Sequence, residues 1–168
     1  WQREIPAIAR KVLVTLGGGD PGNVTLKVIQ ALKKVNISEL EAKIVVGPAN
    51  PNLYMLKQEI GDKQNLQIIT NSTNMSELMV WADVAVSAGG SSCWEMALLG
   101  LPNMIMHFAE NQRPIAEKLQ KERSVLNLGW SSDLTVEDIR QNMERLLLSK
   151  EVRMEYSSRS QHLVDGSG

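Results

Sequence analysis

The sequence lacks the features that mark several broad classes of protein. Its 168 residues include one cysteine, carry a formal net charge of -1, and hold no apolar run approaching a membrane span in length. A single cysteine excludes a disulfide framework and a Cys-rich metal site, and it is typical of the reducing cytoplasm, where we expect the protein to act. The small net charge gives no electrostatic footprint for nucleic acid or for an acidic membrane.

Motifs that indicate a particular reaction are also absent. The sequence has no G-x-S-x-G elbow, no G-x-x-x-x-G-K-[ST] loop, no paired-carboxylate motif and no His/Cys metal spacing. We therefore predict no catalytic residue, no metal and no cofactor in this chain. His107 has no acid or nucleophile at a recognisable spacing, so it is interpreted as a structural histidine at a strand end.

What the sequence does contain is a regular alternation of apolar runs and helical patterns. The predicted strands cover 11–17, 42–47, 66–70, 84–88, 103–107 and 125–129. The predicted helices cover 23–35, 51–60, 75–82, 92–99, 114–123, 135–149 and 150–162. Thr135 and Asp138, near the start of the sixth of these helices, resemble a capping box. This order predicts an α/β fold, a Rossmann-like parallel sheet of about six strands with helices on both faces.

The two ends of the chain resemble cut ends of a longer protein. Residues 1–10 are irregular and lead into the first strand, and the last residues read as a turn. We expect 1–10 to be a linker from an N-terminal domain, and 11–168 to form one ligand-binding domain.

The most informative segment follows the fourth predicted strand. Gly89 and Gly90 end the strand, Ser91 and Ser92 open a helix, and Glu95 lies in its first turn. Glycines let a ligand approach the backbone, and a helix start offers free N–H groups and a positive dipole end to an anion. The segment predicts a site for a phosphorylated, hydroxyl-rich ligand. Ser92 and Glu95 also fit a capping box, and the two interpretations do not exclude each other.

A glycine-rich loop, 17–23, follows the first predicted strand. Its three consecutive glycines suggest close approach of a ligand, with Gly18, Gly19 and Asn23 as contacts. The loop also matches the dinucleotide fingerprint G-x-G-x-x-G, but the second strand ends without the acid that would hold the ribose of NAD. An ordinary helix start, with Asp20 as N-cap and a proline at the first helical position, is the other interpretation.

Acid and amide side chains follow the fifth predicted strand. Glu110, Asn111 and Gln112 offer mixed donors and acceptors that suit sugar hydroxyls, although each also fits an N-cap before the helix that contains Pro114. Because ligands bind outside the carboxyl ends of parallel strands, we expect these loops to share one pocket.

These segments together resemble the C-terminal half of GT-B glycosyltransferases. The branch includes the N-acetylglucosaminyltransferase that makes lipid II. A closer resemblance is to the UDP-sugar hydrolase of pseudaminic acid biosynthesis and its spore-coat polysaccharide relatives. The similarity runs from about Lys11 to the end of the chain and rests on residues 17–23, 75–83, 84–90, 92–95, 97–102 and 109–112.

The resemblance implies a role for each segment. Glu95 would bind the ribose hydroxyls of UDP, and the segment from Thr70 to Met75 would frame uracil through backbone groups. Asn111 and Gln112 would face the donor sugar, and the 17–23 loop the cleft near phosphate and sugar. The diphosphate would be bound by the turn made of Gly89, Gly90, Ser91 and Ser92. The general base would come from the N-terminal half.

We therefore interpret the chain as the UDP-sugar-binding C-terminal domain of a GT-B type UDP-sugar hydrolase or glycosyltransferase of surface-glycan biosynthesis. Its expected partners are a UDP-sugar and the N-terminal GT-B domain, with no nucleic acid. Two alternatives stay open at this point: an NAD-binding dehydrogenase domain, and a non-catalytic ligand-sensing α/β module. The sequence leaves the sugar, the acceptor and the reaction undetermined.

Overall fold

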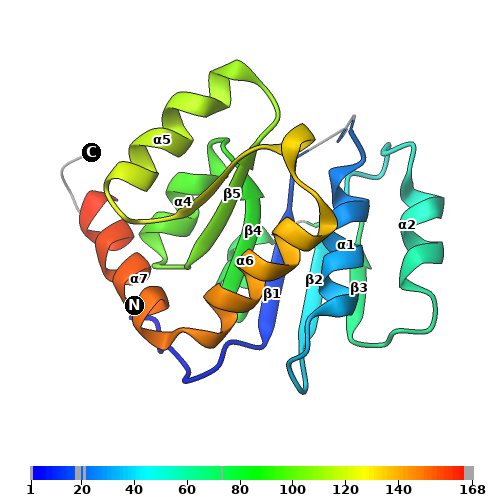
Figure 1. The fold of residues 1–168 in the computed structure, drawn as a ribbon, viewed down its shortest axis with the longest axis horizontal. Coiled ribbons are helices and arrows are strands. Elements are labelled where there is room, and N and C mark those ends of the chain that lie inside the picture. Colours follow the sequence, from blue (N-terminus) through cyan, green and yellow to red (C-terminus); the bar gives the residue numbers. More distant parts are fainter. Residues whose placement is uncertain (1, 18–19, 21, 73, 165–168) are drawn as a thin grey trace.

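A six-stranded parallel sheet forms the centre of the protein (Figure 1). The computed structural model describes residues 2–17, 20, 22–72 and 74–164. The strands lie in the order β3-β2-β1-β4-β5-β6, and each neighbouring pair is parallel. Their bounds are β1 Lys11–Thr15, β2 Glu41–Val45, β3 Leu66–Ile69, β4 Val84–Ala88, β5 Asn103–His107 and β6 Leu126–Trp130. The predicted α/β class and parallel sheet are confirmed.

Helices cover both faces of the sheet. Side chains of α1, α2 and α6 pack into the cluster on one face, and side chains of α3, α4 and α5 pack on the other. Figure 1 shows α7 running on from α6, and α7 contacts α4. The helices of the described residues are α1 Val24–Lys34, α2 Leu53–Ile60, α3 Met75–Trp81, α4 Ser92–Leu98, α5 Arg113–Lys121, α6 Val136–Leu148 and α7 Lys150–Val164, with short 3-10 turns η1 Glu110–Gln112 and η2 Ser131–Asp133. None of these helices is long and apolar enough to cross a membrane.

The strand order reverses beside β1. The chain adds β2 and β3 on one side of β1, and then crosses to add β4, β5 and β6 on the other side. In open parallel sheets of this kind, ligands bind in the crevice at the carboxyl ends of the strands that flank the reversal. Here those strands are β1 and β4, so the loops at 17–23 and 89–91 flank that point.

The central strands are buried on both faces, which explains their continuous apolar runs. Every residue of β4 and of β5 is buried. A parallel strand covered by helices on both sides has no solvent face, so its sequence does not alternate.

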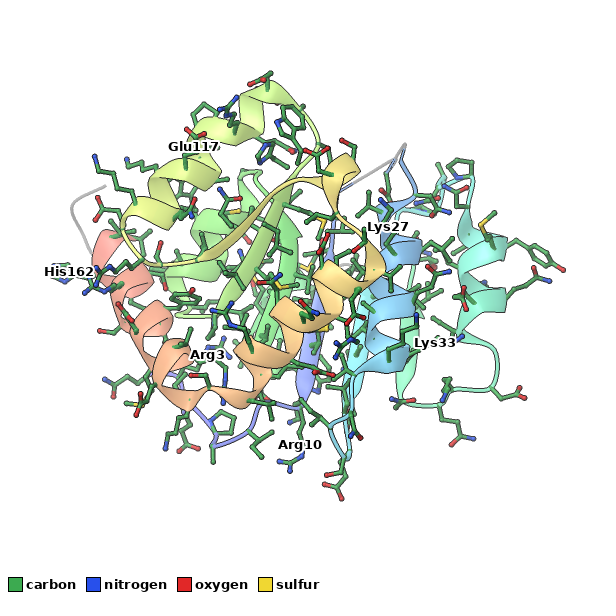
Figure 2. All side chains as sticks on the ribbon, in the orientation of Figure 1. Arg3, Arg10, Lys27, Lys33, Glu117 and His162 are labelled. Carbon is green, nitrogen blue, oxygen red and sulfur yellow. The ribbon has the colours of Figure 1, made fainter. Side chains whose placement is uncertain are left out.

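Lys27 of α1 donates from Nζ to the Leu134 carbonyl at 2.9 Å, and this hydrogen bond links α1 to the start of α6 (Figure 2).

Several element boundaries differ by one or two residues from the sequence prediction, and two of them adjoin the loop after β1. The first strand ends at Thr15 rather than at Gly17, because Gly17 adopts a φ of 87° that leaves the strand conformation. The following helix begins at Val24 rather than Asn23, because Asn23 is left-handed, with a φ of 49°. The predicted ligand contacts Gly18 and Gly19 lie outside the described residues.

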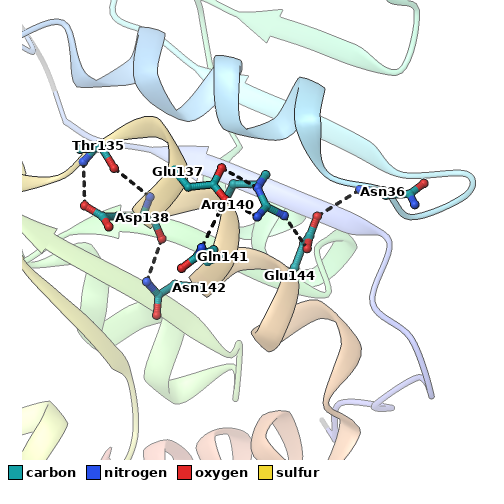
Figure 3. Close-up of polar contacts among 8 residues, drawn as sticks. All are labelled: Asn36, Thr135, Glu137, Asp138, Arg140, Gln141, Asn142 and Glu144. Atoms are coloured by element: carbon teal, nitrogen blue, oxygen red, sulfur yellow. Dashed lines mark hydrogen bonds and ion pairs between the residues drawn. The ribbon is translucent and has the colours of Figure 1, made fainter.

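The start of α6 has the capping box predicted from its sequence (Figure 3). Asp138 N donates to Thr135 Oγ1, and Thr135 N donates to Asp138 Oδ2, each at 3.0 Å. Further along the helix, Arg140 pairs with Glu144 at 2.7 Å, and Glu144 accepts a hydrogen bond from the Asn36 amide just beyond α1. These exposed contacts link α6 to the end of α1 on one face of the sheet.

Candidate functional site

The loops after β4 and β5 are in direct contact. A Cβ atom placed on Gly89 would lie 2.8 Å from the Gln112 carbonyl oxygen and 3.2 Å from its Cβ. Gln112 Oε1 accepts a hydrogen bond from the Phe108 amide at 2.8 Å, and this bond joins the two ends of the turn after β5. The expectation that these two loops come together is confirmed for Gly89 and Gln112.

The amino end of α4 has no side-chain cap. The N-cap residue is Ser91, and Glu95 makes no bond back to the Ser92 amide, so the capping-box interpretation of Ser92 and Glu95 is wrong. The turn is held instead by backbone bonds, from Cys93 N to Gly90 O and from Trp94 N to Ser91 O, each at 3.1 Å. The amides of Ser91 and Ser92 donate to no group among the described residues, and Glu95 is exposed.

The amino end of α1 is arranged differently. The Asp20 carboxylate accepts hydrogen bonds from Val24 N at 2.9 Å and from Thr25 N at 2.8 Å, and Asp20 is only 2% exposed. Asp20 therefore satisfies the first two amides of the helix, although the N-cap residue is Asn23 and not Asp20 as predicted. The predicted geometry is wrong in detail, because the helix starts three residues after Pro21 and not at it. A buried carboxylate occupies the position that an anion would take at this helix end.

The predicted base-binding segment follows β3 at the edge of the sheet. Thr70 is half-buried, and Met75 begins α3. Asn74 Oδ1 accepts a hydrogen bond from Glu77 N at 3.3 Å and so caps that helix. Asn23, from the loop after β1, has a buried Oδ1 without a partner among the described residues.

The turn after β5 presents its polar side chains outward. Glu110 and Asn111 are exposed, and Gln112 is half-buried. Gln112 is the N-cap residue of α5 but makes no side-chain cap bond, and neither Glu110 nor Asn111 caps a helix, so the N-cap interpretation holds only for the position of Gln112. Helix α5 begins at Arg113 with Pro114 in its first turn. Glu110 lies 3.7 Å from Arg113 in an exposed ion pair.

Sequence reasoning missed the environment of His107. The ring is 3% exposed and meets Trp130 edge-on at 4.5 Å between centroids, and neither ring nitrogen has a partner among the described residues. The ring is thus packed inside the protein against Trp130. The Trp130 contact depends on β5 pairing with β6, which no local sequence pattern reveals.

At the carboxyl ends of the strands, the loops of the candidate site carry backbone N–H groups but no Lys or Arg of their own. The loops contain no Lys or Arg at 16–23, 70–75, 89–95 or 108–112. Burial raises the pKa of the Cys93 thiol, which donates to Ala88 O at 3.1 Å, so Cys93 is a neutral packing residue in α4. Within these loops an anion would meet backbone N–H groups, and the adjacent cation Arg113 is paired with Glu117 at 2.8 Å and with Glu110 at 3.7 Å. No group of metal-binding side chains is found in the part of the chain that the structure describes.

An open hollow elsewhere does not compete with this site. It is lined by Leu98, Glu122, Arg159 and His162, at the far ends of α4 and α5 and along α7. Those ends lie at the opposite edge of the sheet from the strand carboxyl ends, where ligands bind in parallel α/β sheets.

Known proteins share this architecture. The chain is 31% identical over 160 residues to the spore coat polysaccharide biosynthesis protein SpsG of Bacillus subtilis, covering 95% of this chain and 47% of SpsG. The crystal structure of MurG from Acinetobacter baumannii matches with a TM-score of 0.71 at 19% identity, over 94% of this chain and 49% of MurG. The spinosyn rhamnosyltransferase SpnG, in a structure with thymidine diphosphate, matches with a TM-score of 0.74 at 20% identity, over 98% of this chain and 42% of SpnG.

The chain thus spans about half the length of the proteins it resembles. The family model described as the glycosyltransferase family 28 C-terminal domain matches residues 12–166. That match includes β1 from Val12 onward, the other five strands and each loop of the candidate site. The chain belongs to the glycosyltransferase family 28 C-terminal domain family.

Proposed function

We propose that this chain binds the nucleotide diphosphate part of a UDP-sugar for a GT-B type UDP-sugar hydrolase or glycosyltransferase of surface-glycan biosynthesis. The observation that carries the proposal is the state of the two helix starts beside the strand reversal. At the α4 start the amides of Ser91 and Ser92 donate to no group in the described part of the chain, whereas at the α1 start the Asp20 carboxylate accepts from the first helical amides.

This contrast argues against the dehydrogenase alternative. A dinucleotide fold places the pyrophosphate on the first helix, after its glycine-rich loop. In this protein a second anion there would lie against the buried Asp20 carboxylate, and like charges at short range repel. The residues after β2, Val46 to Ala49, also provide no acid for the ribose of NAD.

The roles of the site residues follow from their exposure. Glu95 is exposed and its carboxylate is engaged by no cap, so it is free to accept hydrogen bonds from the two ribose hydroxyls. The amides of Ser91 and Ser92 would bind the diphosphate, with Gly89 and Gly90 forming the turn before them, and would stabilise charge as the sugar–phosphate bond breaks. The Thr70–Met75 segment would frame the base.

The donor sugar would meet the turn after β5. Asn111 is exposed, and Gln112 keeps its Nε2 donor, because only its Oε1 is engaged by Phe108. Glu110 is exposed beside them. Asn23, with Gly18 and Gly19, would approach from the loop after β1.

Turnover would need the second GT-B half. A general base must reach the attacking water, and His107 is buried, while Glu95 is assigned to the ribose. We expect this chain alone to hydrolyse UDP-sugars no faster than the uncatalysed background. Steady turnover that is lost in His107→Ala would contradict this division of roles.

The binding proposal is tested by titrating the isotope-labelled chain with UDP, thymidine diphosphate and NAD while recording amide shifts. We expect UDP to shift amides in Thr70–Met75, Gly89–Glu95 and Glu110–Gln112. Larger shifts with thymidine diphosphate than with UDP, in the same amides, would support the proposed site but assign it thymine in place of uracil as the preferred base. If UDP moved none of these amides and NAD moved only the 17–23 loop, the dehydrogenase interpretation would replace ours.

A further inference from the structure

A single arginine before β1 links the ends of two helices. Arg3 donates from Nε to Leu99 O at 3.1 Å, from Nη1 to Ala82 O at 2.5 Å and from Nη2 to Met79 O at 2.7 Å. Ala82 is the C-cap residue of α3, Met79 lies in its last turn, and Leu99 is the C-cap residue of α4. One guanidinium therefore binds the carboxyl ends of both helices.

These contacts suit the chemistry of both partners. The last carbonyls of a helix have no intrahelical partner and carry the negative end of its dipole. The guanidinium has five donors in a fixed planar fork. Burial lowers the pKa of Arg3 to about 10, with the charge of Asp83 acting in the opposite direction, so Arg3 stays protonated at neutral pH. The fork is thus a charged and rigid connection between α3 and α4.

The opposite ends of the same two helices lie at the candidate site. The Thr70–Met75 segment leads into α3, and Gly89–Ser91 leads into α4. Each helix has seven residues, a rod of roughly 10 Å at 1.5 Å per residue. Both pack into one buried cluster that includes Met79 and Met96, so a displacement at one end of a rod is carried to the other.

We infer that Arg3 is a positioning residue for nucleotide binding: by joining the carboxyl ends of α3 and α4, it sets the spacing between the segments at their amino ends. The inference rests on the proposed function, which assigns the base to Thr70–Met75 and the diphosphate to Gly89–Ser92. Arg3 itself does not touch the nucleotide. The segment before β1 thereby contributes to donor affinity from the opposite edge of the sheet.

The chain offers a matched control. Arg153 of α7 is fully buried and also donates to three carbonyls, those of Leu146, Pro6 and Ala7, each at 2.9 Å. It binds the same segment before β1, but none of its acceptors belongs to α3 or α4. Losing Arg153 should destabilise the fold without changing the spacing of those two helices.

The test compares wild type, Arg3→Ala, Arg3→Lys and Arg153→Lys by UDP calorimetry, melting and amide spectra of the ligand-free chain. Lysine keeps the charge at position 3 but lacks the planar fork, so it guards against a failure of the alanine variant to fold. We expect both Arg3 variants to raise the Kd for UDP about threefold to tenfold, the range of indirect coupling effects. Arg153→Lys should change the Kd by less than about twofold, even at a similar loss of melting temperature.

The ligand-free spectra decide the inference independently of UDP. Amide shifts in Arg3→Lys that reach Thr70–Met75 and Gly89–Glu95 support it. Shifts confined to the three acceptor residues, or a Kd equal to that of wild type, overturn it. A wild-type chain that binds no nucleoside diphosphate would instead refute the proposed function, and the ligand-free shifts would still decide whether Arg3 positions the two segments.

Discussion

Gln112 packs on Gly89 so closely that position 89 has no room for a side chain. The Gln112 carbonyl oxygen lies 2.8 Å from where a Cβ atom on residue 89 would be, a separation that real Cβ atoms essentially never show. At the neighbouring Gly90, no atom of the described residues beyond its two chain neighbours lies within 4 Å of the corresponding position. The pair of glycines therefore has two separate roles: Gly89 admits the turn after β5, and Gly90 leaves open space at the start of α4.

The first prediction follows from this difference. Gly89→Ala should lower the free energy of unfolding by about 1–3 kcal/mol, the usual cost of overpacking, because the clash is with backbone. Gly90→Ala should stay within about 0.5 kcal/mol of wild type. Both changes reduce unfolded-state entropy alike, so their difference measures the clash. Equal denaturation midpoints for the two variants would contradict this prediction, because they would show that the backbone at Gln112 moves away from residue 89 at no cost in stability.

The second prediction concerns Glu95. Because Glu95 caps nothing, Glu95→Ala should leave the melting temperature close to that of wild type. If the carboxylate binds both ribose hydroxyls, the same variant should weaken UDP binding by roughly 1.5–3 kcal/mol, as for hydrogen bonds to charged groups. Glu151→Ala, at an exposed position in the first turn of α7, is the control. A loss of stability with unchanged affinity would reverse the assignment.

The third prediction concerns Asp20. Asp20→Ala removes the acceptor for the Val24 and Thr25 amides and should cost about 0.5–2 kcal/mol of stability, the range for a lost helix cap. Asp20→Asn should cost less, because asparagine keeps an acceptor oxygen and tolerates the φ of 38° found here. Urea unfolding of both variants checks this order. An asparagine variant as unstable as the alanine variant would mean that both carboxylate oxygens, or their charge, are needed, because asparagine can accept from only one of the two amides.

The fourth prediction is a pH dependence. Hydrogen bonds from Arg140 are the main cause of the lowered pKa of Glu137, about 2 instead of 4.5. A carboxylate with a lowered pKa in the folded state stabilises the fold above its unfolded pKa, and this contribution is lost as the pH falls through the folded value. The melting temperature of Glu137→Gln should therefore lie below that of wild type at neutral pH. The gap should shrink as the pH falls from about 5 toward 2.

Glu151→Gln serves as the control for that experiment, because Glu151 is likewise exposed and on a helix. This variant removes an exposed helical carboxylate without removing the contacts of Arg140. A constant gap between Glu137→Gln and wild type at every pH would mean that the side chain acts through packing and not through its charge.

The elements and the fold class were predictable because they depend on local patterns. The continuous apolar runs at 84–88 and 103–107 match β4 and β5 residue for residue. The Thr135 capping box was predicted from the sequence, since both of its partners lie within one helical turn. The same local reasoning failed at Ser92 and Glu95. There the turn is held by backbone hydrogen bonds from Cys93 N to Gly90 O and from Trp94 N to Ser91 O, and no side chain caps the helix.

By itself, the sequence determined that the chain forms alternating strands and helices in a parallel sheet, because side-chain periodicity is a property of neighbouring residues. Only the tertiary structure decided which loops meet. It placed Gln112 on Gly89, filled the start of α1 with Asp20, and brought Arg3 to the ends of α3 and α4. Each of these contacts depends on strand order and on distances between backbone atoms, which no stretch of sequence records.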